Sequence, residues 1–176
     1  MLSSQELNIL SADFFFRSDG IVLDIFRVCT LNLEAVTNTS VRKEVKTLMD
    51  LALAEDEYDF SKHIAKARRQ NPIDHATAAF FPQRVFINNE MTTEANVIEI
   101  QALDRIGLLY DCFMAIARHG LEVTHSRIVT EKGAAIDSIF VTTPDKKKVE
   151  DDAVLDALEK ELEEVIALPL PAKATS

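Results

Sequence analysis

Two stretches of the chain follow the same pattern, and this internal repeat constrains the fold more than any other feature of the sequence. Residues 7–28 and 121–141 each read as two β-rich runs joined by a short turn that carries one Gly. In each copy an Asp follows that Gly by four residues, as Asp137 follows Gly133. Gly readily adopts the positive φ that a tight hairpin requires. The repeat therefore predicts two β-hairpins of related structure.

The second copy lies in a longer unit of strands and helices. Residues 84–87 and 95–102 are β-rich, and apolar residues at helical spacing follow until Gly120, a residue type that commonly follows a helix. A second helical stripe covers residues 154–165 and ends before Pro169. The order strand, strand, helix, strand, strand, helix predicts an α+β fold. We expect a ferredoxin-like βαββα arrangement, an antiparallel sheet with helices on one face.

The first copy is shorter. One helix, predicted over residues 41–54, follows its hairpin, and the opening strand and helix of the second copy have no counterpart. A hairpin with one helix leaves an apolar sheet face and unpaired strand edges exposed. Either the hairpin joins the sheet of the second unit, or the chain begins inside a larger protein, and we favour the second explanation.

The 176 residues accommodate one or two domains. We divide the chain into four segments. These are a partial first domain at 1–54, a linker at 55–83 that includes a weakly helical basic stretch, a second domain at 84–168 and a tail at 169–176.

Charge and composition exclude several classes of partner. The chain has 29 Asp+Glu against 19 Lys+Arg, a formal net charge of −10, which opposes binding to nucleic acid or to an anionic membrane. No apolar run approaches the roughly 18 residues of a membrane span, and no secretory pattern is present, so we expect a cytoplasmic protein. Cys29 and Cys112 lie in separate apolar runs without CxxC spacing, which predicts buried, reduced thiols.

The best candidate for a ligand-binding segment lies between a predicted strand and the first turn of the helix that follows. Asp104 is placed to be the N-cap, and Gly107 permits another molecule or chain to approach the backbone closely. Free N–H groups at a helix start suit a carboxylate, whereas Asp104 suits an ammonium group. A zwitterionic amino acid presents both charges. A capped helix start without any ligand is nevertheless the commoner meaning of such a pattern.

Residues 104–111 read Asp-Arg-Ile-Gly-Leu-Leu-Tyr-Asp. This segment resembles the Asp-Arg-Pro-Gly-Leu-Leu-Tyr-Asp signature that opens the helix of an ACT domain, a module that senses small molecules. More narrowly, residues 7–28 and 96–105 resemble the two ACT domains at the C-terminus of bacterial PII uridylyltransferases. The chain departs from the pattern at Ile106, where Pro is more usual, and the first copy lacks a signature loop.

The resemblance implies a regulatory role. The resembled enzymes uridylylate and deuridylylate the PII signal protein in response to glutamine, and their catalytic domains precede the ACT pair. This chain contains neither catalytic domain, so it is expected to be the regulatory region alone, with no catalytic residue, metal ligand or cofactor of its own. The divalent metal of the family would belong to the absent catalytic domains. The implied partners are an amino acid, glutamine first, the catalytic domains of the parent enzyme, and another ACT domain in trans.

The predicted ligand site combines the signature loop with the facing hairpin strand. Asp104 would bind the amino group and the backbone of 105–109 the carboxylate, while the strand would select the side chain. The candidate binding residues are Asp104, Arg105, Ile106, Gly107, Leu108, Leu109, His125 and Ser126. Binding would bias the arrangement of the ACT pair and thereby regulate the catalytic domains.

Two other functions are compatible with the sequence. The chain could be an ACT-type interaction or dimerisation module that binds no metabolite, as the exposed β edges of the incomplete first copy suggest. A freestanding enzyme is disfavoured, because no catalytic arrangement is visible and the four histidines show no metal-ligand spacing.

Overall fold

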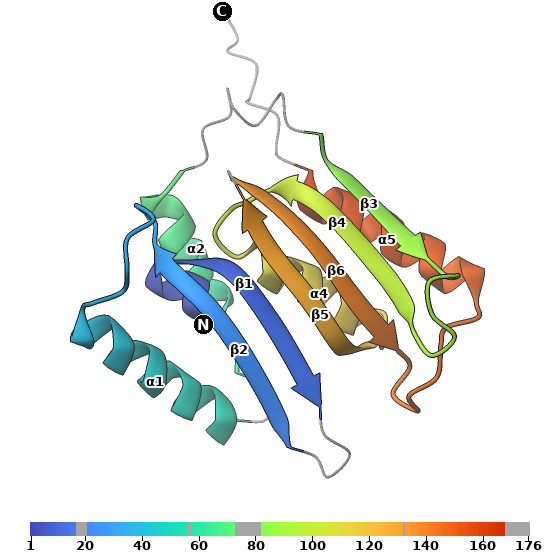
Figure 1. Cartoon of the computed structure of the whole chain (residues 1–176), viewed down its shortest axis with the longest axis horizontal. Coiled ribbons are helices and arrows are strands. Elements are labelled where there is room, and N and C mark those ends of the chain that lie inside the picture. The colour runs from blue at the N-terminus through green and yellow to red at the C-terminus, as the bar shows by residue number, and fades with distance from the viewer. Residues whose placement is uncertain (17–20, 56–57, 73–81, 132, 168–176) are drawn as a thin grey trace, which may run out of the picture.

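The computed structural model of the chain describes residues 1–16, 21–55, 58–72, 82–131 and 133–167. Its strands are β1 (Leu7–Phe16), β2 (Val22–Thr30), β3 (Arg84–Asn88), β4 (Asn96–Leu103), β5 (Glu122–Glu131) and β6 (Ala134–Thr142). Its helices are the short 3-10 helix η1 (Leu2–Gln5) and the α-helices α1 (Thr39–Ala54), α2 (Ser61–Gln70), α4 (Leu108–Arg118) and α5 (Asp152–Ile166). The strands form one sheet in the order β2-β1-β5-β6-β4-β3, and every pair is antiparallel (Figure 1).

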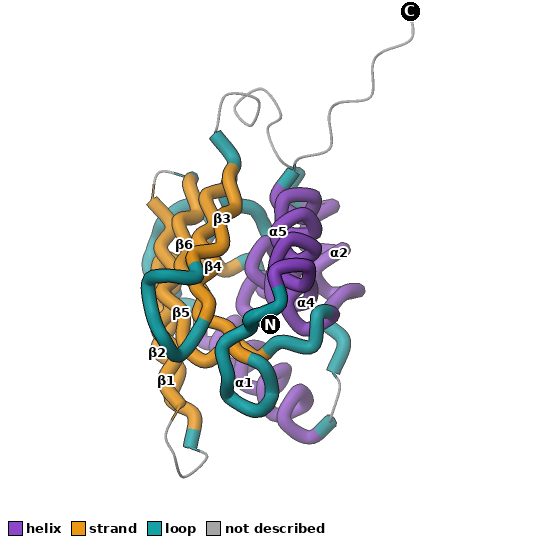
Figure 2. Tube along the Cα trace, turned by 90° about the vertical axis from the view of Figure 1, so that its right-hand side faces the viewer, coloured by secondary structure: helices purple, strands orange, loops and turns teal. Residues whose placement is uncertain are grey.

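The described helices lie on one side of this sheet, and the other side carries none (Figure 2). This confirms the predicted α+β fold with helices on one face. The sequence periodicity explains the two layers, because apolar residues three or four positions apart share one face of a helix. In α4 and α5 these positions are buried against the sheet, namely Leu108, Cys112, Ala115 and Ile116, then Leu155, Leu158, Leu162 and Ile166.

The hydrophobic core lies between these two helices and the central strands. The alternation predicted for residues 95–102 places Ile98, Ile100 and Ala102 in β4 toward the helices, each at most 2% exposed. Val97 is buried as well. Strand β4 pairs with β3 on one edge and with β6 on the other. The predicted strands 84–87 and 95–102 are therefore neighbours in the sheet.

The first hairpin joins the sheet of the second unit. In the β1–β5 pair, Ser11 lies opposite Val129 and Ala12 lies opposite Ile128. Of our two explanations for the incomplete first copy, the structure shows the one that we favoured less. The pairing covers the edge of β5 from Arg127 to Val129, where backbone hydrogen-bonding groups would otherwise remain open.

Several predicted segments fall partly or wholly outside the described residues. These are the first hairpin turn at 17–20, part of the linker at 56–57 and 73–81, and the tail at 169–176. In the second turn, Gly133 has the predicted positive φ, 80°. Cys29 and Cys112 are buried and free, as predicted.

The two helices before the second unit differ in how they pack. The predicted helix at 41–54 is α1, but it has no buried residue. Helix α2, inside the segment that we treated as a linker, buries Ile64 and Ala67. Residues 61–70 are therefore part of the packed structure, and they lie close to the signature loop.

Candidate ligand site

The signature loop joins the end of β4 to the start of α4. The backbone N–H of Asp104 donates to the Gly133 carbonyl, 2.8 Å away, which fastens the loop to the turn between β5 and β6. A further turn, closed by a 3.1 Å hydrogen bond from Leu108 N–H to Arg105 O, separates Asp104 from the helix. Gly107, with φ 77°, occupies the N-cap, and no side chain caps the helix. The predicted N-cap role of Asp104 is therefore wrong.

Gly107 is approached closely, as its residue type suggested, but the approaching group belongs to the same chain. A Cβ added to Gly107 would lie 2.5 Å from Ile64 Cγ2 and 2.7 Å from Arg68 Nη2. Both atoms come from α2. Helix α2 thus covers the face of the loop that we had assigned to a ligand or to another chain.

Ion pairs around the loop hold α2, α4 and α5 together. Arg68 Nε donates to Ile106 O at 2.9 Å, and Arg68 Nη2 lies 2.6 Å from Asp111 Oδ2. The same Asp111 oxygen lies 2.7 Å from Arg105 Nη1, and Arg105 Nη2 donates to Val165 O at 2.9 Å. The Arg105 side chain therefore connects α4 to the end of α5.

A cavity of about 370 Å³ lies on another side of the loop. Five of the predicted site residues line it, namely Asp104, Arg105, Ile106, Leu108 and Leu109. The start of β1 contributes Leu7, Asn8 and Ile9. Further walls come from the residues just after α2, the C-terminal end of β5 and the start of β6. The cavity is thus lined by both halves of the chain.

Asp104 and Asp137 bring two carboxyl groups to this cavity. Burial raises the pKa of Asp104, while the backbone N–H and the positive charge of Arg105 oppose the rise. Asp137 is 4% exposed. Burial raises its pKa to about 7, the neighbouring charge of Asp104 adds to the rise, and a 3.3 Å hydrogen bond from Val129 N–H opposes it. The cavity therefore favours a positively charged group that offsets this repulsion.

Sequence reasoning missed Asp137 as a site residue, although the signal was present. Asp137 is the residue that follows the turn Gly133 by four positions in the internal repeat. Ile100 of β4 lies opposite it in the sheet, and the side chains of paired residues share a face. That register points Asp137 to the side of the sheet on which the helices and the signature loop lie.

His125 and Ser126 do not line this cavity. Strand β5 reaches the signature loop only at its C-terminal end, where Ile128 and Thr130 line the cavity. His125 instead has its Nδ1 2.9 Å from Phe14 O and its ring centroid 5.3 Å from that of Phe140. Ser126 is fully buried, and its Oγ has no hydrogen-bond partner among the described residues. The structure therefore places both residues away from the cavity, and their contact with a ligand stays an untested prediction.

The described ranges contain no group of three or more His, Cys, Asp or Glu side chains that could hold a metal ion. Within the same ranges, no helix is both long and apolar enough to cross a bilayer.

The curated relatives of the chain include two bifunctional enzymes. Over 168 residues the chain is 29% identical to the bifunctional uridylyltransferase/uridylyl-removing enzyme of Rhodospirillum rubrum. The aligned region covers 95% of this chain and 18% of that enzyme. Over 144 residues it is 27% identical to the enzyme of the same name from Azospirillum brasilense, covering 80% of this chain and 15% of that enzyme. The chain therefore spans less than a fifth of the length of these relatives. No solved structure matches it.

The family comparison agrees with the fold. Residues 84–176, more than half of the chain, match the family described as an ACR9-like, ACT-like domain. The matched residues contain β3, β4, α4, β5, β6 and α5, and hence the signature loop together with both carboxyl groups of the cavity. The chain therefore belongs to the ACT-like domain family, and it resembles the ACT-like region of uridylyltransferase/uridylyl-removing enzymes.

Proposed function

We propose that this chain is the amino-acid-sensing region of a PII uridylyltransferase, and that an α-amino acid, glutamine first, binds in the cavity beside the signature loop. The observation that carries the proposal is the pairing of Asp104 and Asp137 in a cavity with apolar walls. The resemblance to two bifunctional uridylyltransferase/uridylyl-removing enzymes supports the assignment to such an enzyme.

Each part of an amino acid has a suitable surface in the cavity. The ammonium group lies between Asp104 and Asp137 and favours their ionised forms. Leu7, Ile9 and Ile128 offer apolar surface to the methylene groups of the side chain. Asn8 and Thr130 offer hydrogen-bonding groups to the terminal amide. The carboxylate binds to loop N–H groups other than those of Asp104 and Leu108, which already donate to Gly133 O and Arg105 O. The guanidinium of Arg105 contacts Asp111 and Val165 instead.

Ligand binding can regulate the enzyme because both halves of the chain line the cavity. Asn8 and Asn71 belong to the first half of the chain, whereas the loop and Asp137 belong to the second. A ligand that contacts both halves stabilises one arrangement of the two, and it shifts the population toward that arrangement by its difference in affinity. In the whole enzyme this shift alters the contacts with the catalytic domains and sets the balance between uridylylation and deuridylylation.

Isothermal titration calorimetry with L-glutamine at pH 7.5 tests the proposal. We expect saturable binding that Asp137→Asn weakens by about tenfold or more, because the substitution removes one of the charges facing the ammonium group. Asp145→Asn is the matched control, since Asp145 is exposed in the turn after β6, and it leaves the affinity unchanged. Glutamine binding with equal affinity to both variants, or no binding to the folded chain, contradicts the proposal.

A second candidate function, an ACT-type interaction module without a metabolite, is favoured by one observation. The hairpin of the first half extends the sheet of the second half through the β1–β5 pair, so sheet extension is already how this chain joins its parts. A folded chain that ignores both L-glutamine and L-aspartate, yet pairs with another ACT domain, would support this function instead.

A further inference from the structure

Asn71 follows the last residue of α2 and forms part of the cavity wall. It lines the cavity beside the signature loop. It also lines a second cavity of about 430 Å³, to which Glu6 contributes. Glu6 does not line the first cavity. Asn71 therefore belongs to the wall that the two cavities share, with Glu6 on the side of the second cavity.

The side-chain amide of Asn71 has a fixed orientation. Its Nδ2 donates to Glu6 Oε1 at 3.0 Å and to Ala67 O at 3.1 Å. Both partners are oxygen atoms that accept hydrogen bonds, so the amide nitrogen, and not the amide oxygen, faces them. A primary amide has two N–H groups, and these two bonds use both. The hydrogen-bonding atom that remains on this side chain is Oδ1, which is an acceptor.

The main chain beside this amide has its N–H groups used or missing. The N–H of Asn71 donates to Ala67 O at 3.1 Å and to Arg68 O at 3.3 Å. Pro72, the next residue in the cavity wall, has no N–H. Asn71 and Pro72 therefore present acceptors to the cavity. Such a wall suits a ligand group that donates hydrogen bonds and opposes a carboxylate, which only accepts them.

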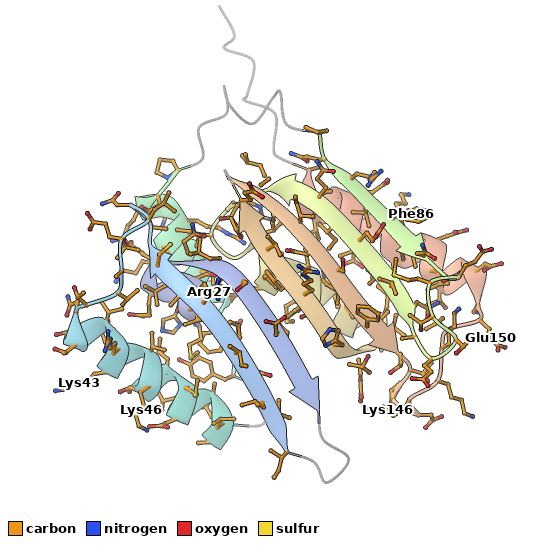
Figure 3. All side chains as sticks on the ribbon, viewed as in Figure 1. Arg27, Lys43, Lys46, Phe86, Lys146 and Glu150 are labelled. Atoms are coloured by element: carbon orange, nitrogen blue, oxygen red, sulfur yellow. The ribbon has the colours of Figure 1, made fainter. Side chains whose placement is uncertain are left out.

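A ligand carboxylate near Asn71 also has no available cation. Among the described residues that line the cavity, Arg105 alone has a basic side chain, and its guanidinium contacts Asp111 and Val165 O. The basic side chains labelled in Figure 3 do not line the cavity, namely Arg27 on β2, Lys43 and Lys46 on α1 and Lys146 in the turn after β6. A negatively charged ligand side chain is therefore disfavoured by both charge and hydrogen bonding.

We propose that Asn71 selects the side chain of the ligand, because its Oδ1 accepts a hydrogen bond from the amide N–H of L-glutamine and offers none to the carboxylate of L-glutamate. This inference rests on the proposed function, since it requires an amino acid in this cavity. Asn8 and Thr130 then serve the oxygen of the ligand amide, because both can donate. Asn71 is thus a specificity-determining residue, and Glu6 is a positioning residue that holds its amide.

Calorimetry with L-glutamine and L-glutamate at pH 7.5 tests the proposal through the ratio of the two affinities. We expect the parent chain to bind L-glutamine about tenfold or more tightly than L-glutamate. Asn71→Leu, which retains a side chain of similar size, lowers this ratio by about fivefold or more, because it removes the acceptor. The matched control is Gln70→Leu, an exposed neighbour outside the cavity wall, and it leaves the ratio unchanged.

An exchange of two side chains separates ligand recognition from the packing of α2. The double variant Glu6→Gln with Asn71→Asp keeps the net charge, and the carboxylate at position 71 accepts from the amide at position 6. It still presents an acceptor to the cavity, but it no longer donates to Ala67 O. We expect it to bind L-glutamine at least as tightly as one third of the parent affinity, about, and to retain the preference over L-glutamate. If Asn71 served only to close the end of α2, this exchange would weaken L-glutamine as much as Asn71→Leu does.

Failure of this inference and failure of the proposed function give different results. A folded parent chain that binds neither amino acid contradicts the proposed function, and this inference with it. Saturable binding of L-glutamine with a ratio that Asn71→Leu leaves unchanged overturns this inference alone, because the preference then comes from Asp104 and Asp137. Parent affinity for L-glutamate that equals or exceeds that for L-glutamine, or an exchange variant as weak as Asn71→Leu, also overturns this inference alone.

Discussion

Arg68 in α2 and Asp111 in α4 form an ion pair, with 2.6 Å between Nη2 and Oδ2. The same carboxylate contacts Arg105, and Arg105 donates to Val165 O at the end of α5. One carboxylate thus links three helices around the signature loop. The loop is therefore held in shape by the protein itself, and a ligand in the adjacent cavity meets a preorganised wall.

Removal of Arg68 weakens the attachment of α2. We expect Arg68→Ala to lower the free energy of unfolding by about 1 kcal/mol, because the variant loses an ion pair and the hydrogen bond to Ile106 O at a site that is partly exposed to solvent. Urea denaturation measures the change. The control is Lys46→Ala, which breaks a largely exposed pair with Asp50 in α1 and changes the stability by less than about 0.5 kcal/mol. Equal effects of the two substitutions would contradict this role.

A side chain at Gly107 both strains the backbone and displaces α2. Gly107→Ala places a Cβ 2.5 Å from Ile64 Cγ2 at a positive φ, whereas Gly120→Ala meets no atom within 4 Å at a similar φ of 69°. Both variants lose about 1 kcal/mol to the left-handed conformation. We expect Gly107→Ala to lose at least about 1 kcal/mol more from the clash. Thermal denaturation of the two variants checks this, and matching midpoints would mean that α2 is not held against the loop.

Asp137 makes stability depend on pH. Its folded-state pKa of about 7 lies above the usual 3.8, so the folded chain binds more protons than the unfolded chain between these values. The contribution of Asp137 is therefore fully present below about pH 4, and it is lost as the pH rises toward 7. The loss amounts to at most about 4 kcal/mol. Asp104, whose pKa is also raised, acts in the same direction.

Asp137→Asn isolates that dependence. We expect the variant to be more stable than the parent chain at pH 8, with the advantage shrinking as the pH falls below 7, because Asn requires no buried ionisation. Denaturant titrations at several pH values measure the difference. Asp145→Asn, in an exposed turn, leaves the pH profile unchanged. A constant difference between Asp137→Asn and the parent chain at all pH values would show that this carboxyl does not titrate near neutrality.

Ligand affinity follows the same titration. An ammonium ligand binds the ionised carboxyl groups better than the protonated ones, so the affinity for L-glutamine rises as the pH increases from 6 to 8. Calorimetry over this range measures the slope. Asp137→Asn reduces the slope, since it removes the group that titrates near 7. An affinity that falls with pH would contradict the placement of the ammonium group.

Local periodicity predicted the second unit well. The helical stripes of α4 and α5 and the alternation in β4 lie within single elements, so their apolar residues can be read without knowing the neighbours. The β1–β5 pair is not local. The sequence of a short β-rich run does not specify which strand edge in the sheet it will pair with. The structure shows the pairing that we favoured less.

The geometry of the candidate site was predicted in part, for equally physical reasons. The signature residues pointed to a loop that lines the cavity, but an extra turn at Gly107 separates Asp104 from the N-cap. That this loop binds a ligand stays a prediction. The sequence of α2 is polar and basic, and nothing in it predicts a contact with that loop. In the structure, however, Ile64 and Arg68 of α2 approach Gly107 closely. Strand β5 reaches the cavity only at its C-terminal end, so His125 does not line it. The register of β6 places Asp137 in the cavity wall.

A backbone amide NMR titration with L-glutamine, with L-aspartate as the control, tests the central claim most directly. The account predicts saturable shifts for L-glutamine that include both sides of the cavity, Leu7 to Ile9 in β1 and Asp104 to Leu109 in the loop, together with Asp137. L-Aspartate, with a negatively charged side chain, causes smaller shifts, because the cavity already holds two carboxyl groups. A folded sample whose spectrum does not change with L-glutamine, or shifts confined to residues far from this cavity, would contradict the claim that the chain senses an amino acid there.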